Sequence, residues 1–549
     1  MNRLIIFVAC LFACSHYLLL AQGNAQNQGI QKISMVMYAI ENMYVDKVDQ
    51  DKLAEDAIVA LLEKLDPHSN YLNKEEVKEM NEPLQGNFDG IGVQFNMLTD
   101  TLYVIQVISG GPSEKVGMRA GDRIIEVDDT IISGVKMKTP DIMKRLRGTK
   151  GTTVRVKVLR QNTPPLIEFR IIRDKIPIYS LDAAYMADKE TGYIRLNRFA
   201  ATSHQEYLKS FKELKDLGMK NLILDLQGNG GGYLNIAIDI CNEFLAANKT
   251  IVYTEGASQK REDAKATQKG GFETGKLVVL IDETSASASE IVAGAVQDWD
   301  RAVVVGRRSF GKGLVQRPLP LPDGSMIRLT TARYYTPTGR CIQKHYENGD
   351  QDSYNKDLVE RYNNGEMLHA DSIHFPDSLK YNTLVNKRVV YGGGGIMPDY
   401  FVPFDTSRYT PLHREISYKG IINKVTMNYI DTHRDELRKK YKNFESFSSK
   451  FSINETFIDE LIDAVKTERL SEQTDSSKVS ADSIFTAKDM EDLKKSKTLI
   501  SLQLKALVAR DLWEINEYYR IMNQDNASFL KAVEIINDEK EYNKLLGTN

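Results

Sequence analysis

The chain has 549 residues, of which 42% are hydrophobic and 27% charged, and its formal net charge is -3. This length corresponds to about three or four domains, and the composition allows most of the chain to bury cores. Acidic and basic residues are balanced and interspersed, so the sequence gives no reason to expect nucleic acid as a partner.

The first 25 residues predict a secretory signal peptide. Met1-Asn2-Arg3 is a short basic start, and the segment from Leu4 to Leu20 is largely apolar. A membrane anchor is the alternative, but the apolar run is short and is broken by Ser15-His16. The residues up to Cys14 loosely resemble a lipoprotein processing site. We therefore expect an exported protein of the periplasm or cell envelope, in a soluble or a lipid-anchored form.

Residues 26–83 are predicted to form an N-terminal helical arm. Apolar residues recur there at three- and four-residue spacing, and the pattern stops at Asp66-Pro67, as a helix does before proline. Residues 84–174 are predicted to be β-rich, with strands near 102–108 and 154–159 and two short helices. That size and content indicate a small binding module.

Residues 175–405 are predicted to alternate strands and helices, which indicates an α/β fold with a largely parallel layer. Within this region, residues 345–388 are polar and indicate a surface insertion. Residues 406–549 are predicted to be helical, with a flexible linker over 471–483. Cys241 and Cys341 are the two cysteines beyond the signal segment. We expect buried free thiols, with a single disulfide as the alternative, and no metal-ligand spacing.

Ser287 is the candidate nucleophile. It lies in the run Ser285 to Ile291, after an apolar strand and at the start of a helix. A helix N-terminus offers unpaired N–H groups and partial positive charge, which favour an oxyanion beside a nucleophile. The small neighbouring residues allow a substrate backbone to come close. The alternative is an ordinary capping serine.

Lys312 is the candidate general base. A serine needs a base to attack a peptide carbonyl, and a buried lysine serves because desolvation disfavours its charged form. Glycines on both sides allow the loop to bring the amine close, although a surface lysine is the alternative. Gln316 follows in a strand-like stretch, where its amide would orient the amine.

The segment Gly228-Asn229-Gly230-Gly231-Gly232 follows the strand that ends at Leu226. It lacks the spacing of a dinucleotide-binding loop and the Lys-Ser/Thr of a P-loop. We interpret it as a turn whose N–H groups face the serine.

These residues resemble the active site of the C-terminal processing (tail-specific) peptidases, in which Ser-Ala-Ser-Ala-Ser-Glu-Ile is followed by Gly-Lys-Gly. The resemblance implies that Ser287 is the nucleophile, Lys312 the base and Gln316 the third catalytic residue. Leu224 to Gly232 is similar to the family's D-L-R-x-N-x-G-G turn, with Gln227 in place of the usual arginine. The same match implies Gly231 and Ala288 as oxyanion donors, and leaves the choice among Gly230 to Gly232 open.

The resemblance covers roughly residues 30 to 405. Tyr44-Val45-Asp46 and the segment from Leu65 to Tyr71 are similar to the family's N-terminal region. The segments Tyr335 to Arg340 and Gly395 to Asp399 are similar to the end of its core. The family implies a crotonase/ClpP-like β-α protease core with an inserted PDZ domain and no metal or cofactor.

The β-rich module resembles a PDZ domain. Gly90, Ile91, Gly92 and Val93 are similar to the carboxylate-binding loop of PDZ domains, and Ala120 to Ile124 is similar to their A-G-D-x-I turn. The resemblance implies strand addition and capture of a terminal carboxylate by loop N–H groups. The expected partners are proteins or peptides with free, apolar C-termini. The sequence also allows a homo-oligomer, and membrane contact only through the signal or a lipid.

Other catalytic classes are less consistent with the sequence. His68 and His204 are candidate bases for a Ser-His-Asp triad, but no G-x-S-x-G elbow is present. Ser309-Phe310-Gly311-Lys312 spells S-x-x-K, without the S-D-N and K-T-G partners of penicillin-binding enzymes. No H-E-x-x-H motif indicates a metalloprotease. A PDZ scaffold on an inactive protease fold and a crotonase-like acyl-CoA enzyme are further alternatives, but the former would lack Ser287 or Lys312 and the latter would have no use for a PDZ module.

Overall fold

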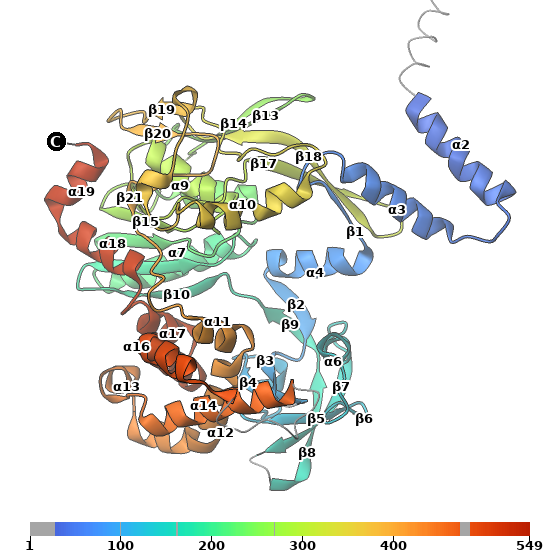
Figure 1. The fold of residues 1–549 in the computed structure, drawn as a ribbon, viewed down its shortest axis with the longest axis vertical. Coiled ribbons are helices and arrows are strands. Elements are labelled where there is room, and N and C mark those ends of the chain that lie inside the picture. Colours follow the sequence, from blue (N-terminus) through green and yellow to red (C-terminus); the bar gives the residue numbers. More distant parts are fainter. Residues whose placement is uncertain (1–27, 99, 161–162, 268–269, 473–483, 549) are drawn as a thin grey trace, which may run out of the picture.

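The computed structural model describes residues 28–98, 100–160, 163–267, 270–472 and 484–548 (Figure 1). The predicted signal peptide and most of the predicted linker lie outside these residues. No helix of the described ranges combines the length and apolar content needed to cross a membrane.

The N-terminal arm extends away from the rest of the molecule (Figure 1). Its elements are α2 (Gln28–Met43), α3 (Gln50–Leu62), β1 (Asn70–Leu72) and α4 (Lys74–Gln85). No residue of α2 is buried, and Leu62 is the only buried residue of α3. The loop after α3 runs back to the body of the protein, where β1 pairs antiparallel with β18 (Met326–Tyr335).

The β-rich module is a sheet in whose strands buried and partly exposed residues alternate, as in β4 and β7, and two short helices pack against it. Its core holds Ile91, Leu102, Val156 and Ile142. The elements are β2 (Asn87–Gly90), β3 (Val93–Leu98), β4 (Thr101–Val107), α5 (Pro112–Lys115), β5 (Arg123–Val127), β6 (Thr130–Ile131), α6 (Thr139–Leu146), β7 (Thr153–Arg160), β8 (Thr163–Ile172) and β9 (Asp174–Pro177). The strand order is β3-β4-β5-β7-β8, with β6 beside β5. The antiparallel pair β2 and β9 forms the double connection between this module and the core.

The α/β core contains a six-stranded sheet in the order β10-β11-β12-β15-β16-β21. The strands from β11 onward are parallel, and β10 is antiparallel to β11. Strands such as Leu277–Ile281 are apolar at every position because both faces of the sheet are covered. The elements are β10 (Leu181–Met186), β11 (Thr191–Leu196), α7 (Ser203–Asp216), β12 (Asn221–Asp225), α8 (Leu234–Asn242), β15 (Leu277–Ile281), α9 (Ala288–Asp298), β16 (Val303–Gly306) and β21 (Tyr400–Phe401).

A second sheet lies beside the first and carries the loop that follows β16. It consists of β1, β18, β13 (Thr250–Gly256) and β14 (Gln259–Lys265), with β17 (Leu314–Pro320) paired to β18. The predicted polar insertion, residues 345–388, has secondary structure of its own. It contains α10 (Gln351–Asn363), two 3-10 turns (Ala370–Ser372 and Asp377–Leu379) and β19 (Lys380–Asn382), which pairs with β20 (Val389–Tyr391) just after it.

The C-terminal region is helical, and its helices pack in two places: most share a core of their own, and the last two lie on the six-stranded sheet. Its elements are α11 (Pro411–Tyr418), α12 (Ile421–Lys440), α13 (Phe444–Lys450), α14 (Glu455–Ser471), α16 (Ala487–Leu512), α17 (Ile515–Met522), α18 (Ala527–Asn537) and α19 (Glu539–Leu546). The helices from α11 to α17 share one apolar core. In contrast, Phe529 and Ile535 of α18 and Leu546 of α19 pack on the six-stranded sheet against strand residues such as Ile223 and Val278.

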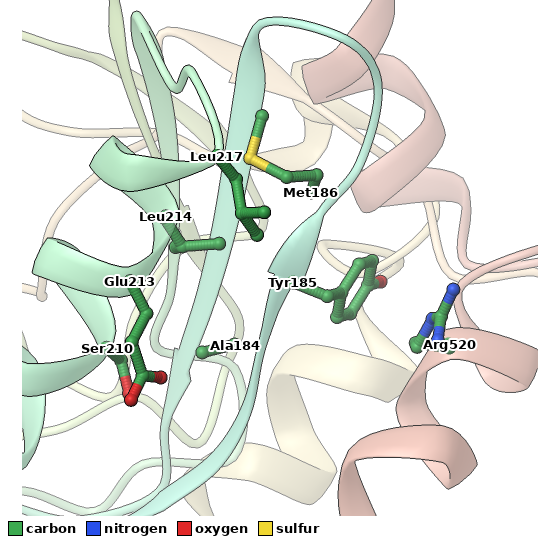
Figure 2. A pocket seen from close by; sticks show the side chains of 8 residues that line it. All are labelled: Ala184, Tyr185, Met186, Ser210, Glu213, Leu214, Leu217 and Arg520. Carbon is green, nitrogen blue, oxygen red and sulfur yellow. The ribbon is translucent and has the colours of Figure 1, made fainter.

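A pocket of about 300 Å³ lies where α17 meets α7 and β10 of the α/β core (Figure 2). It is lined by residues of α7, β10 and α17, including Glu213, Tyr185 and Arg520. Ser287 and Lys312 do not line this pocket. Cys241 and Cys341 are both free, as expected; Cys241 is buried, and Cys341 is only partly buried.

The described architecture agrees with the predicted organisation: an α/β core with an inserted β-rich module, an N-terminal helical arm and a helical C-terminal region.

Candidate active site

Ser287 occupies the position immediately before α9, where the chain leaves β15 in a tight turn. Its backbone has φ of 56° and ψ of -111°, a conformation that non-glycine residues rarely adopt. Such strain persists only where surrounding contacts fix it, and it gathers at functional sites. Here the Ser287 N–H donates to Glu290 Oε2 at 2.8 Å, and the Ser287 carbonyl accepts from the Tyr334 hydroxyl at 3.1 Å.

The Glu290 carboxylate ties α9 to the loop that carries Lys312. It is fully buried and accepts from Ser287 N–H, Ser309 Oγ (2.5 Å), Gly311 N–H (2.7 Å) and Lys312 N–H (2.9 Å). Burial raises the pKa of Glu290 to about 7, whereas the four donors favour the ionised form. Sequence reasoning assigned no role to Glu290, although the Ser-x-x-Glu spacing of a capping box was a signal for a contact of this kind.

Lys312 lies on the loop between β16 and β17, and the same hydroxyl that binds Ser287 also binds Lys312. Tyr334 donates to the Lys312 carbonyl as well as to the Ser287 carbonyl. Burial, followed by the positive charge of Arg328, lowers the pKa of Lys312 to about 8. At pH 7 about one-tenth of this amine is therefore neutral, far more than for an exposed lysine, and the neutral form is the one that a general base requires.

The glycines beside Lys312 are required by close packing. Gly311 has φ of 91°, and a Cβ there would lie 3.0 Å from Lys344 Cβ and 3.1 Å from Gly395 N. A Cβ at Gly313 would lie 2.8 Å from the backbone N of Gln343. The loop consequently fits tightly between α9 and the segment from 341 to 344.

Gln316 is on β17, opposite Thr330 of β18. Its Nε2 donates to Thr330 Oγ1 at 3.2 Å, and Thr330 Oγ1 donates to Asp66 Oδ1 at 2.8 Å. Asp66 in turn acts on Lys312, because its negative charge raises the pKa of that amine. A chain of two hydrogen bonds through Thr330 therefore links Gln316 to Asp66, the carboxylate that raises the pKa of Lys312.

The loop from Asp66 to Ser69 is a part of the site that sequence reasoning treated as structural. His68 Nε2 lies 2.8 Å from the Tyr354 hydroxyl of α10. Burial, together with the charge of Lys312, lowers the pKa of His68 to about 3, so this imidazole is neutral near neutral pH. The motif Asp-Pro-His-Ser was visible in the sequence, but its proximity to Lys312 depends on how the N-terminal arm folds back.

The glycine turn after β12 lies against Ser287. Gly231 has φ of 103°, and a Cβ there would lie 2.8 Å from Ser287 Cβ and 3.0 Å from Ala288 N. Asn229 joins the two segments, since its carbonyl accepts from Ala286 N–H at 3.0 Å and Ser289 Oγ at 2.8 Å. The turn and the start of α9 consequently form one packed unit.

Two N–H groups of this unit are relevant to an oxyanion. Ala288 is the first residue of α9, where an N–H has no partner within the helix. The Gly231 N–H donates to Asn229 Oδ1 at 2.9 Å, so an oxyanion would compete with that acceptor. Gly230 and Gly232 remain alternative donors from the same turn.

Two of the alternative catalytic assignments conflict with the geometry. Ser309 is fully buried and donates to Glu290, and its Oγ also accepts from Ile396 N–H at 2.6 Å, so it is not available as the nucleophile of an S-x-x-K motif. His204 is paired with Glu243 at 2.9 Å, and His68 with Tyr354. Neither imidazole hydrogen-bonds to a serine among the residues that the structure describes.

The loop of Gly90 to Val93 joins β2 to β3 in the PDZ-like module. Ile91 is buried, and its carbonyl accepts from Ser113 N–H at 3.0 Å and Ser113 Oγ at 2.6 Å. Gly92 has φ of 77°, and a Cβ there would lie 3.0 Å from Ile176 Cδ1. Among the described strands β3 pairs only with β4, so β3 is an edge strand and no described strand occupies its second edge.

Family models match four parts of the chain. Peptidase family S41 matches residues 190–352, and the PDZ domain matches residues 90–171. A model described as the N-terminal domain of the activating protease CtpB matches residues 19–76. A family of unknown function matches residues 412–514 of the helical C-terminal region.

Known proteins with similar sequences carry names that agree with these models. The carboxy-terminal-processing protease of Bartonella bacilliformis is 35% identical, over 62% of this chain and 80% of that protein. The carboxy-terminal processing protease CtpB of Bacillus subtilis is 33% identical, over 59% of this chain and 68% of that protein. Among solved structures, the photosystem II D1 C-terminal processing protease is 29% identical with a TM-score of 0.33, covering 56% of this chain and 83% of that one. The chain therefore belongs to the C-terminal processing proteases of peptidase family S41, and it is a serine-type endopeptidase with a PDZ domain.

Proposed function

We propose that this protein is an exported endopeptidase that captures the free C-terminus of a protein substrate and cleaves it with Ser287 as nucleophile and Lys312 as general base. The observation that carries the proposal is that Ser287 and Lys312 are hydrogen-bonded to the same two side chains. Both backbones are fixed by the Glu290 carboxylate and by the Tyr334 hydroxyl. The side chain of Lys312 is at the same time sufficiently buried to lower its pKa to about 8.

In the proposed reaction, neutral Lys312 Nζ accepts the proton of Ser287 Oγ as that oxygen attacks the scissile carbonyl. The N–H of Ala288 and an N–H of the glycine turn, assigned to Gly231, stabilise the oxyanion; one such donor is typically worth ~2.7–4 kcal/mol. The C–N bond then breaks, and the protonated Lys312 returns the proton to the leaving amine. Water attacks the acyl-enzyme with Lys312 again as base, which regenerates Ser287.

We assign Gln316 to the orientation of the Lys312 amine. Its Nε2 is occupied by Thr330, which leaves its Oε1 as the acceptor for an ammonium group. Because Gln316 would act through Lys312, we expect Gln316→Ala to lower kcat more than it changes KM.

We further propose that residues 84–174 bind the substrate tail and that residues 175–405 cleave it. The N–H groups of Gly90 to Val93 would bind the terminal carboxylate, and the substrate would add a strand to the second edge of β3. An apolar terminal side chain suits the apolar core beneath this loop. Deletion of 84–174 tests whether the module also controls access to Ser287. If it does, the deletion changes the cleavage rates of tailed and untailed substrates by different factors. Equal cleavage rates with and without the module would contradict that control.

Export rests on the pattern of the first 25 residues. It predicts that the protein recovered from cells lacks this segment and lies in the periplasmic or envelope fraction. N-terminal sequencing of the fractionated protein tests this, and an intact N-terminus in the cytosolic fraction would contradict it.

A serine-directed fluorophosphonate probe tests the dyad directly. Ser287 Oγ displaces fluoride from phosphorus, and Lys312 takes the serine proton, so the intact mass of the wild-type protein should increase by one phosphonyl group located on Ser287. Ser287→Ala should not react, and Lys312→Ala should react far more slowly. Phosphonylation of a different serine, such as Ser309, would contradict the assignment.

A further inference from the structure

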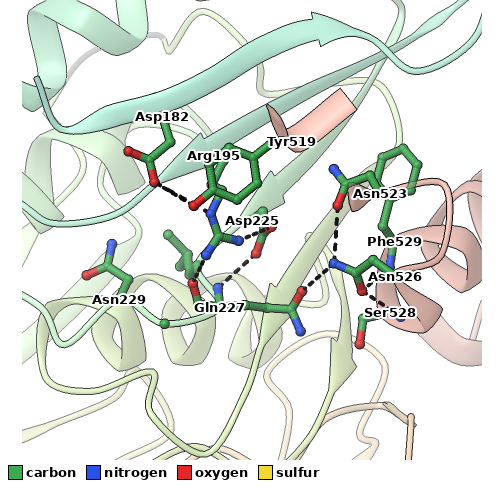
Figure 3. Close-up of polar contacts among 12 residues, drawn as sticks. Asp182, Arg195, Asp225, Gln227, Asn229, Tyr519, Asn523, Asn526, Ser528 and Phe529 are labelled. Carbon is green, nitrogen blue, oxygen red and sulfur yellow. Dashed lines mark hydrogen bonds and ion pairs between the residues drawn. The ribbon is translucent and has the colours of Figure 1, made fainter. Parts of the chain in front are cut away.

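Asn526, at the start of α18, contacts the residue that leads into the glycine turn (Figure 3). Asn526 caps α18, because its Oδ1 accepts from Ser528 N–H at 3.1 Å and Phe529 N–H at 3.3 Å. These bonds fix the orientation of the amide and direct Nδ2 outward. Nδ2 then donates to Gln227 Oε1 at 3.2 Å and to Asn523 Oδ1, at the end of α17, at 3.2 Å.

Gln227 is the first residue after Leu226 and leads directly into the glycine turn. Its N–H donates to Asp225 Oδ1 at 2.8 Å, and its carbonyl accepts from Arg195 Nη2 at 2.7 Å. With Asn526 on the side chain, Gln227 is held from three directions. In the family pattern an arginine usually stands at this position, and Gln227 replaces it here.

Arg195 supplies a guanidinium beside the turn, and the C-terminal region covers it. Arg195 Nη1 donates to the fully buried Asp225 Oδ2 at 2.5 Å. Its guanidinium lies 4.6 Å from the centre of the Tyr519 ring of α17, and the Tyr519 hydroxyl donates to Asp182 Oδ2 at 3.1 Å. The ring shields the ion pair from water, which strengthens the attraction between the two charges.

The helix that carries Asn526 is packed closely against the protease sheet. Phe529, three residues after Asn526, is buried against the protease sheet and packs edge to face on Tyr193 at 5.2 Å. The Tyr193 hydroxyl donates to Asp225 Oδ2 at 2.5 Å. The apolar packing of α18 and the polar support of the turn consequently share the same residues.

We propose that Asn526 is a positioning residue of the protease: through Gln227 it holds the glycine turn where the N–H groups must meet the oxyanion. The inference rests on the proposed Ser287–Lys312 mechanism and extends it to the helical C-terminal region. Displacing an oxyanion donor by about 1 Å removes much of its effect on the transition state and little of ground-state binding. Loss of the Asn526 contact therefore lowers kcat and leaves KM nearly unchanged.

The test compares four variants of the full-length protein on a soluble peptide substrate. Asn526→Ser keeps a capping oxygen for α18 but removes the donor to Gln227. Asn537→Ser is the matched control, because Asn537 Nδ2 bonds Asp188 Oδ2 at 2.9 Å from the other end of the same helix, away from the turn. Gln227→Ala removes the contact from the turn side. The double variant of Asn526→Ser and Gln227→Ala tests whether the two changes act through one contact.

We expect Asn526→Ser and Gln227→Ala each to lower kcat about tenfold, with KM within twofold of wild type. The kcat of the double variant should be no lower than that of Gln227→Ala. Asn537→Ser should match wild type in both kcat and KM. Equal losses of kcat and of Tm in Asn526→Ser and Asn537→Ser would overturn the inference, because they would assign Asn526 a purely structural role. A kcat of Asn526→Ser within twofold of wild type would also overturn it. Ser287→Ala separates the two proposals. If Ser287→Ala is inactive, only the role of Asn526 is contradicted; if Ser287→Ala is active, the proposed mechanism itself is contradicted.

Discussion

Ser287 holds a backbone conformation that costs a non-glycine residue about 1–3 kcal/mol. Two hydrogen bonds to its backbone, from Tyr334 and to Glu290, stabilise that conformation. The same two partners fix the backbone of Lys312, so the nucleophile and its proposed base share their supports.

The pH dependence of kcat/KM reports the proton on Lys312. Because the pKa of Lys312 is about 8 and the neutral amine is the base, kcat/KM should fall about tenfold per pH unit below pH 7 and level off above pH 9. Arg328 lowers this pKa, so Arg328→Gln should move the rising limb to higher pH. A profile that is flat between pH 6 and pH 9 in the wild-type protein would contradict the role of Lys312.

Gly231→Ala tests the contact between the glycine turn and the nucleophile. The new Cβ would lie 2.8 Å from Ser287 Cβ at a φ of 103°, so either the turn or the nucleophile must move. We expect kcat/KM to fall at least 100-fold while the far-ultraviolet circular dichroism stays that of wild type. Gly230→Ala is the comparison, because a Cβ there meets nothing within 4 Å and its N–H is retained; it should lose far less activity. Similar losses in both variants would argue against the assigned geometry.

At the scale of elements, Glu290 joins α9 to the loop between β16 and β17. Glu290→Gln places an amide N–H₂ against N–H and O–H donors, and it should reduce the free energy of unfolding by about 2–4 kcal/mol. Activity should fall with it, because the elements that carry Ser287 and Lys312 separate. Urea unfolding followed by fluorescence measures the change.

Glu283→Gln is the matched control for this prediction. Glu283 makes one ion pair, with Arg307 at 2.6 Å, and its amide would keep one oxygen toward that guanidinium. We expect a loss of about 1 kcal/mol and nearly normal activity. If both variants lose equal stability, Glu290 does not have the joining role described here.

The sequence predicted the elements of the core because each carries a local signal. The all-apolar strand 277–281, the glycine turn and the Ser-rich helix start were each visible in a few consecutive residues. Contacts between distant segments had no local signal. Tyr334 and the approach of Asp66 to Lys312 follow from β18 pairing with both β1 and β17. The packing of α18 on the protease sheet joins residues as far apart as Phe529 and Tyr193, about 340 positions along the chain, and an amphipathic helix does not specify its partner in the sequence.

At the scale of the whole molecule, the C-terminal region touches both functional parts. Asn526 contacts Gln227, just before the glycine turn, while α12 contacts the PDZ sheet through the Asp431–Arg123 ion pair at 2.5 Å. Asn96 of β3 also donates to Met427 Sδ of α12 at 3.4 Å. The PDZ domain is therefore held both by the β2–β9 connection and by α12.

Charge reversal at this contact tests whether α12 restrains the PDZ domain. Arg123→Asp should increase hydrogen exchange in β3 and β4, because the ion pair, only about one-fifth exposed, is replaced by repulsion. Combining Arg123→Asp with Asp431→Arg should restore the exchange rates of wild type. Unchanged exchange in the single variant would show that the β2–β9 connection alone holds the domain.

The most direct test of the central claim is proteolysis of one unstructured reporter protein that ends either in a free apolar C-terminus or in the same residues amidated. Wild type, Ser287→Ala and Lys312→Ala are compared on both reporters. The proposed function predicts cleavage by wild type alone, and much faster cleavage of the free terminus than of the amidated one. Cleavage that survives Ser287→Ala, or equal rates on the two reporters, would contradict the catalytic assignment or the recognition of the tail, respectively.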